Sequence, residues 1–313
     1  MSKVAFVFPG QGSQYVGMGA EFFDRFEEAA AVFRKADEIL GFSLTELCFQ
    51  GPPEKLNQTR FTQPAVFTTS IAVFEVLKAK GVKFDAVAGH SLGEYSAVVA
   101  AGVLDFSEGL RIVQKRAELM EAAYPQGEGG MLAILGLEPE KVKEICDQAS
   151  TQGVVTPANF NSPEQVVVSG ERKALEIVTV LARKKGAKRV IPLQVSGPFH
   201  SPLMKEASEQ LALLLKEFRF SPPQVAFVSN VTGGYVFAPD EIKRLLIEQL
   251  TAPVLWEGAV RRLFQDGCQT FIEVGPGKVL SGLIKRILSG VQVFQTGDLR
   301  SLEKVLALSG RSV

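Results

Sequence analysis

Residues 89–93 have the sequence GHSLG, which fits the G-x-S-x-G pattern of a nucleophilic serine on a sharp turn. Residues 84–88 before it are short and largely apolar, typical of a buried strand, and residues 94–101 after it favour a helix. A serine at such a junction is held in strained backbone geometry, and the flanking glycines leave room for the turn. The turn exposes the hydroxyl at the positive end of the helix, so we predict that Ser91 is a nucleophile. A glycine-rich turn without catalytic function is the alternative.

A serine hydroxyl needs a base, and the chain contains two histidines, His90 and His200. Histidine is the usual base near neutral pH. His90 is adjacent to Ser91, and neighbouring side chains on an extended turn point apart. His200 lies in a loop at residues 195–202, next to an expected domain junction, where catalytic groups often occur. We therefore predict that His200 is the base. A structural histidine is the alternative, and spacing alone does not identify the group that orients its second ring nitrogen.

The oxyanion of an acyl-transfer intermediate needs two backbone N–H donors. Leu92, directly after the predicted nucleophile, supplies one by geometry. The second is expected from the turn at residues 9–14, PGQGSQ, which follows the first predicted strand and so lies at the same edge of the sheet. This turn does not fit a dinucleotide fingerprint, because Tyr15 occupies the third glycine position, and the chain has no Gly-Lys-Ser/Thr phosphate loop. A tight turn that needs glycine for its backbone remains the alternative.

Arg116 is a charged residue on an apolar face. In the predicted helix 107–123 it shares a stripe with Ile112, Leu119 and Ala123. A guanidinium there must either extend to solvent along the helix or meet an anion, because an unpaired buried charge is costly. The first behaviour is the more common. The helix closely follows the helix that begins after Ser91, so Arg116 could face the same cleft. In that case contact with an anion predicts a substrate carboxylate held by two hydrogen bonds.

A basic run, RKKGAKR, occupies residues 183–189 and includes Lys184, Lys185, Lys188 and Arg189. A solvated helix terminus that complements the helix dipole is the simpler interpretation. Docking of an acidic or phosphate-bearing partner is the alternative.

The composition excludes several classes of protein. The chain has 313 residues, 46% of them hydrophobic, with 34 Lys and Arg against 34 Asp and Glu. This balance gives no reason to expect nucleic acid or a membrane surface as a partner. No apolar run reaches the about 18 residues of a membrane span, and residues 1–8 do not resemble a targeting segment. We therefore expect a cytoplasmic protein.

The three cysteines, Cys48, Cys146 and Cys268, are far apart in the sequence. Their odd number argues against a disulfide framework, and their spacing excludes a C-x-x-C metal site. We therefore expect neither disulfides nor a metal.

The order of predicted elements indicates an α/β fold with a mostly parallel sheet and a small inserted domain. A chain longer than roughly 250–300 residues is expected to contain a second unit. We predict a large domain of residues 1–125 and 197–313 and a small domain of residues 126–196. In the large domain the main predicted strands and helices are 4–8, 21–40, 62–80, 84–88, 94–101, 107–123, 224–229 and 270–274, with Asp105 and Glu108 as a capping pair. The small domain is predicted to follow the βαββαβ order of a ferredoxin-like unit, with elements 131–137, 139–150, 154–159, 165–170, 171–185 and 189–195.

Several motifs together resemble those of the malonyl-CoA:acyl-carrier-protein transacylases of fatty-acid synthesis. The resemblance extends along the whole chain, and its motifs are residues 8–14, 63–65, 89–96, 159–163, 197–201 and 273–277. It implies an α/β-hydrolase-like core with a ferredoxin-like insert. It also implies that Ser91 is acylated, that His200 is its base, and that the N–H groups of Gln11 and Leu92 form the oxyanion hole. The substrates would be malonyl-CoA and acyl carrier protein, with no metal or nucleotide cofactor.

Three further roles follow only from the resemblance. Arg116 would bind the malonyl carboxylate, the backbone carbonyl of Gln249 would orient His200, and Phe199 would leave little room for an α-methyl group. The acidic carrier would dock near the basic run. A polyketide acyltransferase of the same family is an open alternative. A serine thioesterase is another, and it would need a carboxylate on His200. A non-catalytic binding role would leave the Ser91 turn and Arg116 unexplained.

Overall fold

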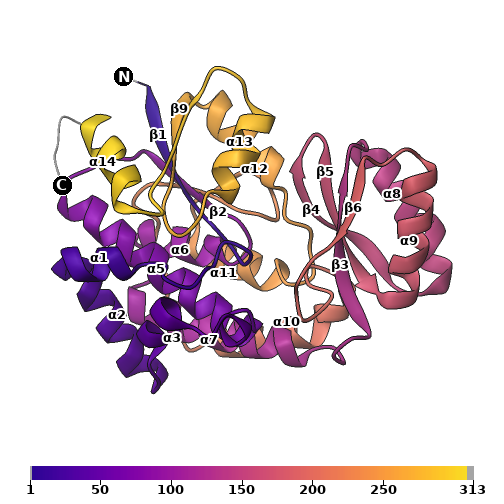
Figure 1. Cartoon of the computed structure of the whole chain (residues 1–313), viewed down its shortest axis with the longest axis horizontal. Coiled ribbons are helices and arrows are strands. Elements are labelled where there is room, and N and C mark those ends of the chain that lie inside the picture. The colour runs from indigo at the N-terminus through magenta and orange to yellow at the C-terminus, as the bar shows by residue number, and fades with distance from the viewer. Residues whose placement is uncertain (1, 309–313) are drawn as a thin grey trace.

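The computed structural model describes residues 2–308, in which a six-stranded sheet forms the centre of the larger unit (Figure 1). The strand order is β10-β9-β1-β2-β7-β8, and every neighbouring pair is parallel except β7 and β8. This agrees with the predicted mostly parallel sheet. Its strands are β1 (Lys3–Phe8), β2 (Ala86–Gly89), β7 (Ala226–Val228), β8 (Tyr235–Val236), β9 (Cys268–Glu273) and β10 (Gln292–Gln295).

Helices pack on both faces of this sheet. Side chains alternate along β1, so that Phe6 and Phe8 enter one hydrophobic core and Ala5 and Val7 enter another. Figure 1 shows α2, α5 and α7 below the sheet and α12 and α13 above it. The helices of this unit are α1 (Ala20–Arg25), α2 (Glu27–Leu40), α3 (Leu44–Gln50), α4 (Pro53–Leu56), α5 (Thr59–Ala79), α6 (Gly93–Ala100), α7 (Phe106–Ala122), α10 (Lys205–Leu215), α11 (Pro239–Glu248), α12 (Trp256–Gln265), α13 (Val279–Ile287) and α14 (Leu299–Leu308).

Two predictions of local structure have different outcomes. The continuous helix expected at residues 21–40 is wrong, because Phe26 has an extended backbone that separates α1 from α2. Its ring packs in the core 6.2 Å from that of Phe22, so tertiary packing outweighs helix propensity there. The predicted capping pair is confirmed: Asp105 and Glu108 form a reciprocal capping box at the start of α7.

The inserted segment has the predicted βαββαβ order and its own core. Its strands pair antiparallel in the order β4-β5-β3-β6. The last strand is shorter than the predicted 189–195, because the chain leaves the sheet after Pro192 and turns Leu193 and Val195 toward the cavity described below. The elements are β3 (Gly129–Leu135), α8 (Pro139–Ala149), β4 (Val155–Ser162), β5 (Gln165–Glu171), α9 (Arg172–Lys184) and β6 (Arg189–Pro192).

Backbone hydrogen bonds join the inserted segment to the larger unit. Phe160 N–H donates to the Val254 carbonyl at 2.9 Å, and Val254 N–H donates to the Ala158 carbonyl at 2.8 Å. Strand β4 is therefore tied to the segment that precedes α12. No helix within residues 2–308 is long and apolar enough to cross a membrane.

Candidate active site

Ser91 lies on the turn between β2 and α6, as the sequence predicts. A Cβ atom at Gly89 would come within 1.9 Å of the Gly93 carbonyl oxygen, and one at Gly93 within 2.0 Å of the Phe8 carbonyl oxygen. Both glycines are therefore required by close backbone packing. Ser91 has φ +51° and His200 has φ +56°, and within the described residues no other non-glycine residue has positive φ. Backbone strain thus coincides with the two groups predicted to react.

His200 contacts Ser91 directly. Its Nε2 lies 2.7 Å from Ser91 Oγ, and its Nδ1 lies 2.7 Å from the carbonyl oxygen of Gln249. A carbonyl oxygen only accepts, so Nδ1 carries the hydrogen and the Nε2 lone pair is free to take the serine proton. Burial, followed by the positive charge of Arg116, lowers the pKa of His200 to about 3. The ring is therefore neutral near pH 7, as a general base must be.

Gln249 supplies that carbonyl because of its position just after α11. The last carbonyls of a helix lack partners within the helix, so the oxygen of Gln249 is available to His200. Within the described residues, no carboxylate is hydrogen-bonded to His200. The arrangement matches the role that the resemblance assigns to Gln249.

His90 is turned away from Ser91. Its Nε2 lies 2.7 Å from Asn161 Oδ1, and its ring stands edge-on to the ring of Trp256. Burial lowers its pKa. His90 thus braces the turn against the neighbouring segments, and the elimination that favoured His200 agrees with the geometry.

The predicted oxyanion turn lies beside the nucleophile turn. Strands β1 and β2 pair in parallel with Phe8 opposite Gly89, so the segments that follow them leave the sheet together. The approach is close, because a Cβ atom at Gly10 would come within 2.4 Å of the His90 carbonyl oxygen. Gln11 and Leu92 line the same cavity as Ser91 and His200. The two residues predicted to donate to an oxyanion therefore both adjoin the serine.

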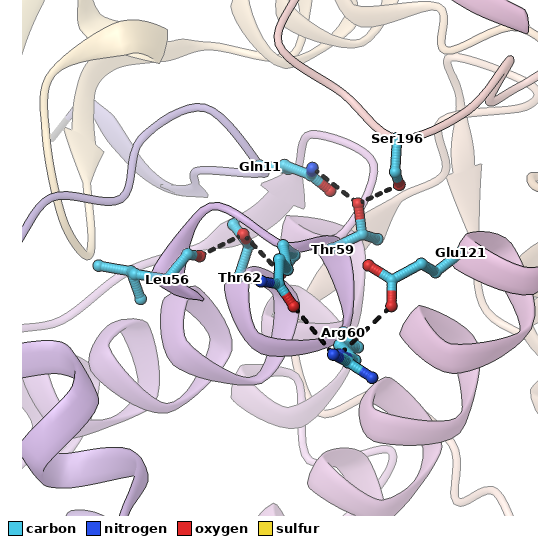
Figure 2. Close-up of polar contacts among 8 residues, drawn as sticks. Gln11, Leu56, Thr59, Arg60, Thr62, Glu121 and Ser196 are labelled. Atoms are coloured by element: carbon cyan, nitrogen blue, oxygen red, sulfur yellow. Dashed lines mark hydrogen bonds and ion pairs between the residues drawn. The ribbon is translucent and has the colours of Figure 1, made fainter. Parts of the chain in front are cut away.

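The side chain of Gln11 anchors this turn to the rest of the site (Figure 2). Gln11 Nε2 donates to Thr59 Oγ1 at 3.1 Å, and Thr59 Oγ1 lies 2.8 Å from Ser196 Oγ. Thr59 begins α5, and Ser196 belongs to the segment that returns from the inserted strands. Arg60, next to Thr59, pairs with Glu121 of α7 at 3.5 Å. The turn at residues 9–14 is therefore connected to the start of α5 and to the segment that returns from the inserted strands.

Arg116 is completely buried, so of the two alternatives the one in which it extends to solvent is excluded. Its Nη1 donates to Gln63 Oε1 at 2.7 Å, and its Nη2 donates to Gln249 Oε1 at 2.7 Å. Nη2 also lies 3.3 Å from Ser91 Oγ, and the guanidinium lies over the ring of Tyr95. Arg116 Nε has no hydrogen-bond partner among the described residues. The cation is thus positioned beside the predicted nucleophile with spare donor capacity.

A cavity of about 200 Å³ opens above Ser91 and His200. Phe199 forms part of its wall and is buried. Arg116 is not part of the wall, but it contacts two residues that are, Ser91 and Gln63. The other wall residues are Gly10, Gln11, Ser13, His90, Leu92, Met120, Met131, Asn159, Asn161, Gln165, Val167, Leu193, Val195, Val279, Leu280 and Leu283.

The basic run is partly paired with acidic residues. Lys185 contacts Glu144 at 2.9 Å, and Lys188 contacts Glu164 at 3.1 Å. Lys188 and Arg189 line a second hollow next to Gln165, which also lines the main cavity. The basic residues therefore adjoin the site without entering it.

The sequence model of the acyl transferase domain family matches residues 5–297. The chain belongs to this family. It is 47% identical over 304 residues to the malonyl CoA-acyl carrier protein transacylase of Bacillus subtilis (strain 168), and the alignment covers 97% of this chain and 96% of that protein. It is 45% identical over 309 residues to the enzyme of the same name from Escherichia coli (strain K12), with 98% and 100% covered.

Solved structures agree with the assignment of this chain to the acyl transferase family. An acyl carrier protein S-malonyltransferase from Vibrio cholerae superposes with a TM-score of 0.94 at 45% identity, covering 97% of this chain and 100% of that one. A malonyl-transacylase in complex with a type II polyketide acyl-carrier protein superposes with a TM-score of 0.96 at 42% identity, covering 98% and 100%. The family and the overall architecture are therefore shared along the whole chain.

The acyl transferase site also contains residues that the sequence reasoning did not single out. Asn230 follows β7, and its Oδ1 accepts the backbone N–H of Ser91 at 2.7 Å while its Nδ2 donates to the Gly89 carbonyl at 2.5 Å. Glu94, three residues after Ser91, is fully buried beside it. No sequence signal marks Asn230, because its proximity depends on β7 pairing with β2, and the strand order is not readable from spacing.

Proposed function

We propose that this acyltransferase moves the malonyl group of malonyl-CoA to the phosphopantetheine thiol of acyl carrier protein through a malonyl ester on Ser91. The observation that carries the proposal is the contact between Ser91 Oγ and a neutral His200, with Arg116 Nη2 at 3.3 Å from the same oxygen. The names of the related enzymes support it, because they describe malonyl transfer to acyl carrier protein.

The reaction has two matched halves. In the first, His200 Nε2 takes the Ser91 proton while Oγ attacks the thioester carbonyl of malonyl-CoA, and the N–H groups of Gln11 and Leu92 hold the oxyanion. The intermediate then expels CoA as a thiol that takes the proton from His200. In the second half, the carrier thiol gives its proton to His200 and attacks the malonyl ester, and Ser91 leaves with that proton.

The partner of His200 favours transfer to a thiol over hydrolysis. A neutral carbonyl stabilises the imidazolium less than a carboxylate does, and the nearby Arg116 charge weakens the base further. A thiol with a pKa of about 8.5 yields its proton to such a base far more readily than water, with a pKa of about 15.7. We therefore favour a transferase over the thioesterase alternative, which requires a carboxylate at this position.

Arg116 supports malonyl as the acyl group. An acyl chain on Ser91 Oγ begins 3.3 Å from the guanidinium, so its terminal carboxylate lies within reach of a buried cation. Charge-assisted contacts of this kind are the strongest hydrogen bonds that proteins make. Phe199 in the cavity wall would restrict substituents at the α-carbon.

We further propose that residues 126–196 form a separate small domain and that the acidic carrier docks near Lys184, Lys185, Lys188 and Arg189. The hollow that Lys188 and Arg189 line adjoins the cavity through Gln165, which supports this placement. We propose a cytoplasmic location, which three free, buried cysteines support. A carrier of a polyketide pathway is the second candidate, because one structural relative is bound to such a carrier.

The test compares transfer with hydrolysis. Purified enzyme is mixed with labelled malonyl-CoA, with and without the phosphopantetheine form of acyl carrier protein, and the label is followed into carrier and into free malonate. The proposal predicts rapid labelling of the carrier and slow release of malonate when no thiol is present. Rapid malonate release without a carrier would support a hydrolase instead.

A further inference from the structure

Glu94 is a fully buried carboxylate that the mechanism above does not use. It lies in the first turn of α6, three residues after Ser91. One carboxylate oxygen accepts the backbone N–H of Asn230 at 3.0 Å, and the other accepts the side-chain Nε2 of Gln249. One acidic group therefore holds two segments, the one after β7 and the one after α11.

The first of these segments fixes the nucleophile. The side-chain amide of Asn230 spans the strained turn, because it accepts from Ser91 N–H and donates to the Gly89 carbonyl. Ser91 is held at φ +51°, a backbone conformation that is unfavourable for a residue with a side chain. By fixing the backbone of Asn230, Glu94 fixes the group that keeps this turn in shape.

The second segment fixes Arg116, the cation that would bind the substrate carboxylate. The Gln249 amide donates to Glu94 and to the Ser91 carbonyl at 2.9 Å, which leaves its Oε1 to accept from Arg116 Nη2 at 2.7 Å. A donor bound to a carboxylate is polarised, which strengthens the amide oxygen as an acceptor for the guanidinium. The amide thus links Glu94 to Arg116 without direct contact between the two charges.

We propose that Glu94 is a positioning residue that aligns Ser91 through Asn230 and Arg116 through Gln249. The inference rests on the proposed malonyl transfer, because Arg116 matters only for an acyl group that carries a carboxylate. A carboxylate suits this position, since both of its oxygens accept. An amide of the same shape would accept at one atom and place an N–H₂ group against a donor at the other.

Glu94 acts through two arms, one through Asn230 to Ser91 and one through Gln249 to Arg116, and the two arms predict different kinetic effects. Asn230→Ala should slow malonyl and acetyl transfer alike, because both need the serine. Gln249→Ala should lower the malonyl-to-acetyl ratio of kcat/KM, because it loosens Arg116 while the backbone carbonyl for His200 remains. Glu94→Gln should do both, with about 10-fold or greater losses in acetyl transfer and in the ratio, since one arm loses its acceptor and the other keeps only a hydrogen bond to a neutral amide. Adding Gln249→Ala to Glu94→Gln should lower the ratio little further, because both act through one contact.

Glu273→Gln is the matched control. Glu273 is also fully buried, and its two oxygens accept the N–H groups of Leu280 at 3.0 Å and Ser281 at 2.7 Å. It makes no hydrogen bond to Ser91, Asn230, Gln249 or Arg116. This variant should lose stability in a denaturant titration but keep the wild-type malonyl-to-acetyl ratio.

The outcomes separate this inference from the proposed function. If wild-type enzyme does not transfer malonyl to the carrier, the proposed function fails. If wild-type enzyme does so and folded Glu94→Gln keeps both rates and the ratio, Glu94 has no positioning role. If Glu94→Gln does not fold, the other two variants decide: an unchanged ratio in Gln249→Ala, or an unchanged rate in Asn230→Ala, overturns the inference. A loss of ratio in Glu273→Gln equal to that in Glu94→Gln would also overturn it.

Discussion

Replacing Arg116 by alanine should remove most of the preference for malonyl over acetyl groups. In the resting site the guanidinium donates to Gln63 and Gln249 and lies 3.3 Å from Ser91 Oγ. A malonyl carboxylate on this serine gains a charge-assisted contact that an acetyl group does not. Hydrogen bonds to charged groups contribute about 1.5–3 kcal/mol, so malonyl kcat/KM should fall by about 10- to 150-fold.

The same substitution also has a structural cost, and the assay must separate the two effects. Truncation leaves the buried Oε1 atoms of Gln63 and Gln249 without their donor, at about 1–3 kcal/mol of unfolding free energy each. The ratio of kcat/KM for malonyl-CoA to that for acetyl-CoA cancels such general damage. Arg116→Lys should restore part of the ratio, because an ammonium group cannot reach two acceptors in the planar geometry of a guanidinium.

Arg111 provides a control on the same helix. It is exposed in α7, so Arg111→Ala should change neither the ratio nor the stability appreciably. An unchanged malonyl-to-acetyl ratio in folded Arg116→Ala would refute the reasoning and would assign Arg116 a structural role only.

Three other predictions follow from the same geometry. Thr59→Val removes the hydroxyl that joins the Gln11 side chain to Ser196, and the loss of two neutral hydrogen bonds corresponds to about a 5-fold or greater loss in kcat. Thr62→Val should keep the rate, because the Thr62 hydroxyl donates to the backbone carbonyls of Leu56 and Gln58, just before α5, and does not contact Gln11. Phe199→Ala should raise methylmalonyl transfer about 10-fold relative to malonyl transfer, because it opens the cavity wall by more than one methyl group. The pKa of His200 is lowered to about 3 in the folded protein, whereas a histidine in the unfolded chain has a pKa of about 6.5. Between these two pH values the unfolded chain binds more protons than the folded one, so the free energy of unfolding falls as the pH drops through this range. In urea titrations, a His200→Asn variant should therefore lose less stability than the wild type between about pH 7 and about pH 4.5; an equal loss would contradict this.

The sequence contains the proposed nucleophile and the proposed base in recognisable form, because both depend on local features. The glycines around Ser91 are required by close backbone contacts, and two histidines leave few candidates for the base. The βαββαβ order of the insert is also readable, because its elements follow one another with clear breaks. The resemblance to a family supplied Gln249, whose carbonyl no pattern of spacing marks.

The remaining parts of the site depend on the strand order and on packing. Asn230 reaches Ser91 because β7 lies beside β2, and about 140 residues separate them in the chain. The helix pattern of Arg116 left two interpretations open, extension to solvent and contact with an anion, because it shows which face is apolar but not that two glutamine side chains contact the guanidinium. The break at Phe26 arises from ring packing in the core, which local propensity does not include.

Intact-mass analysis after mixing with malonyl-CoA alone tests the central claim most directly. We predict that the protein gains the mass of one malonyl group in the absence of any carrier. Peptide mapping should place the group on Ser91, and addition of the carrier thiol should remove it. The Ser91→Ala variant should gain no mass. An adduct on another residue, or one that persists in Ser91→Ala, would contradict acyl transfer through this serine.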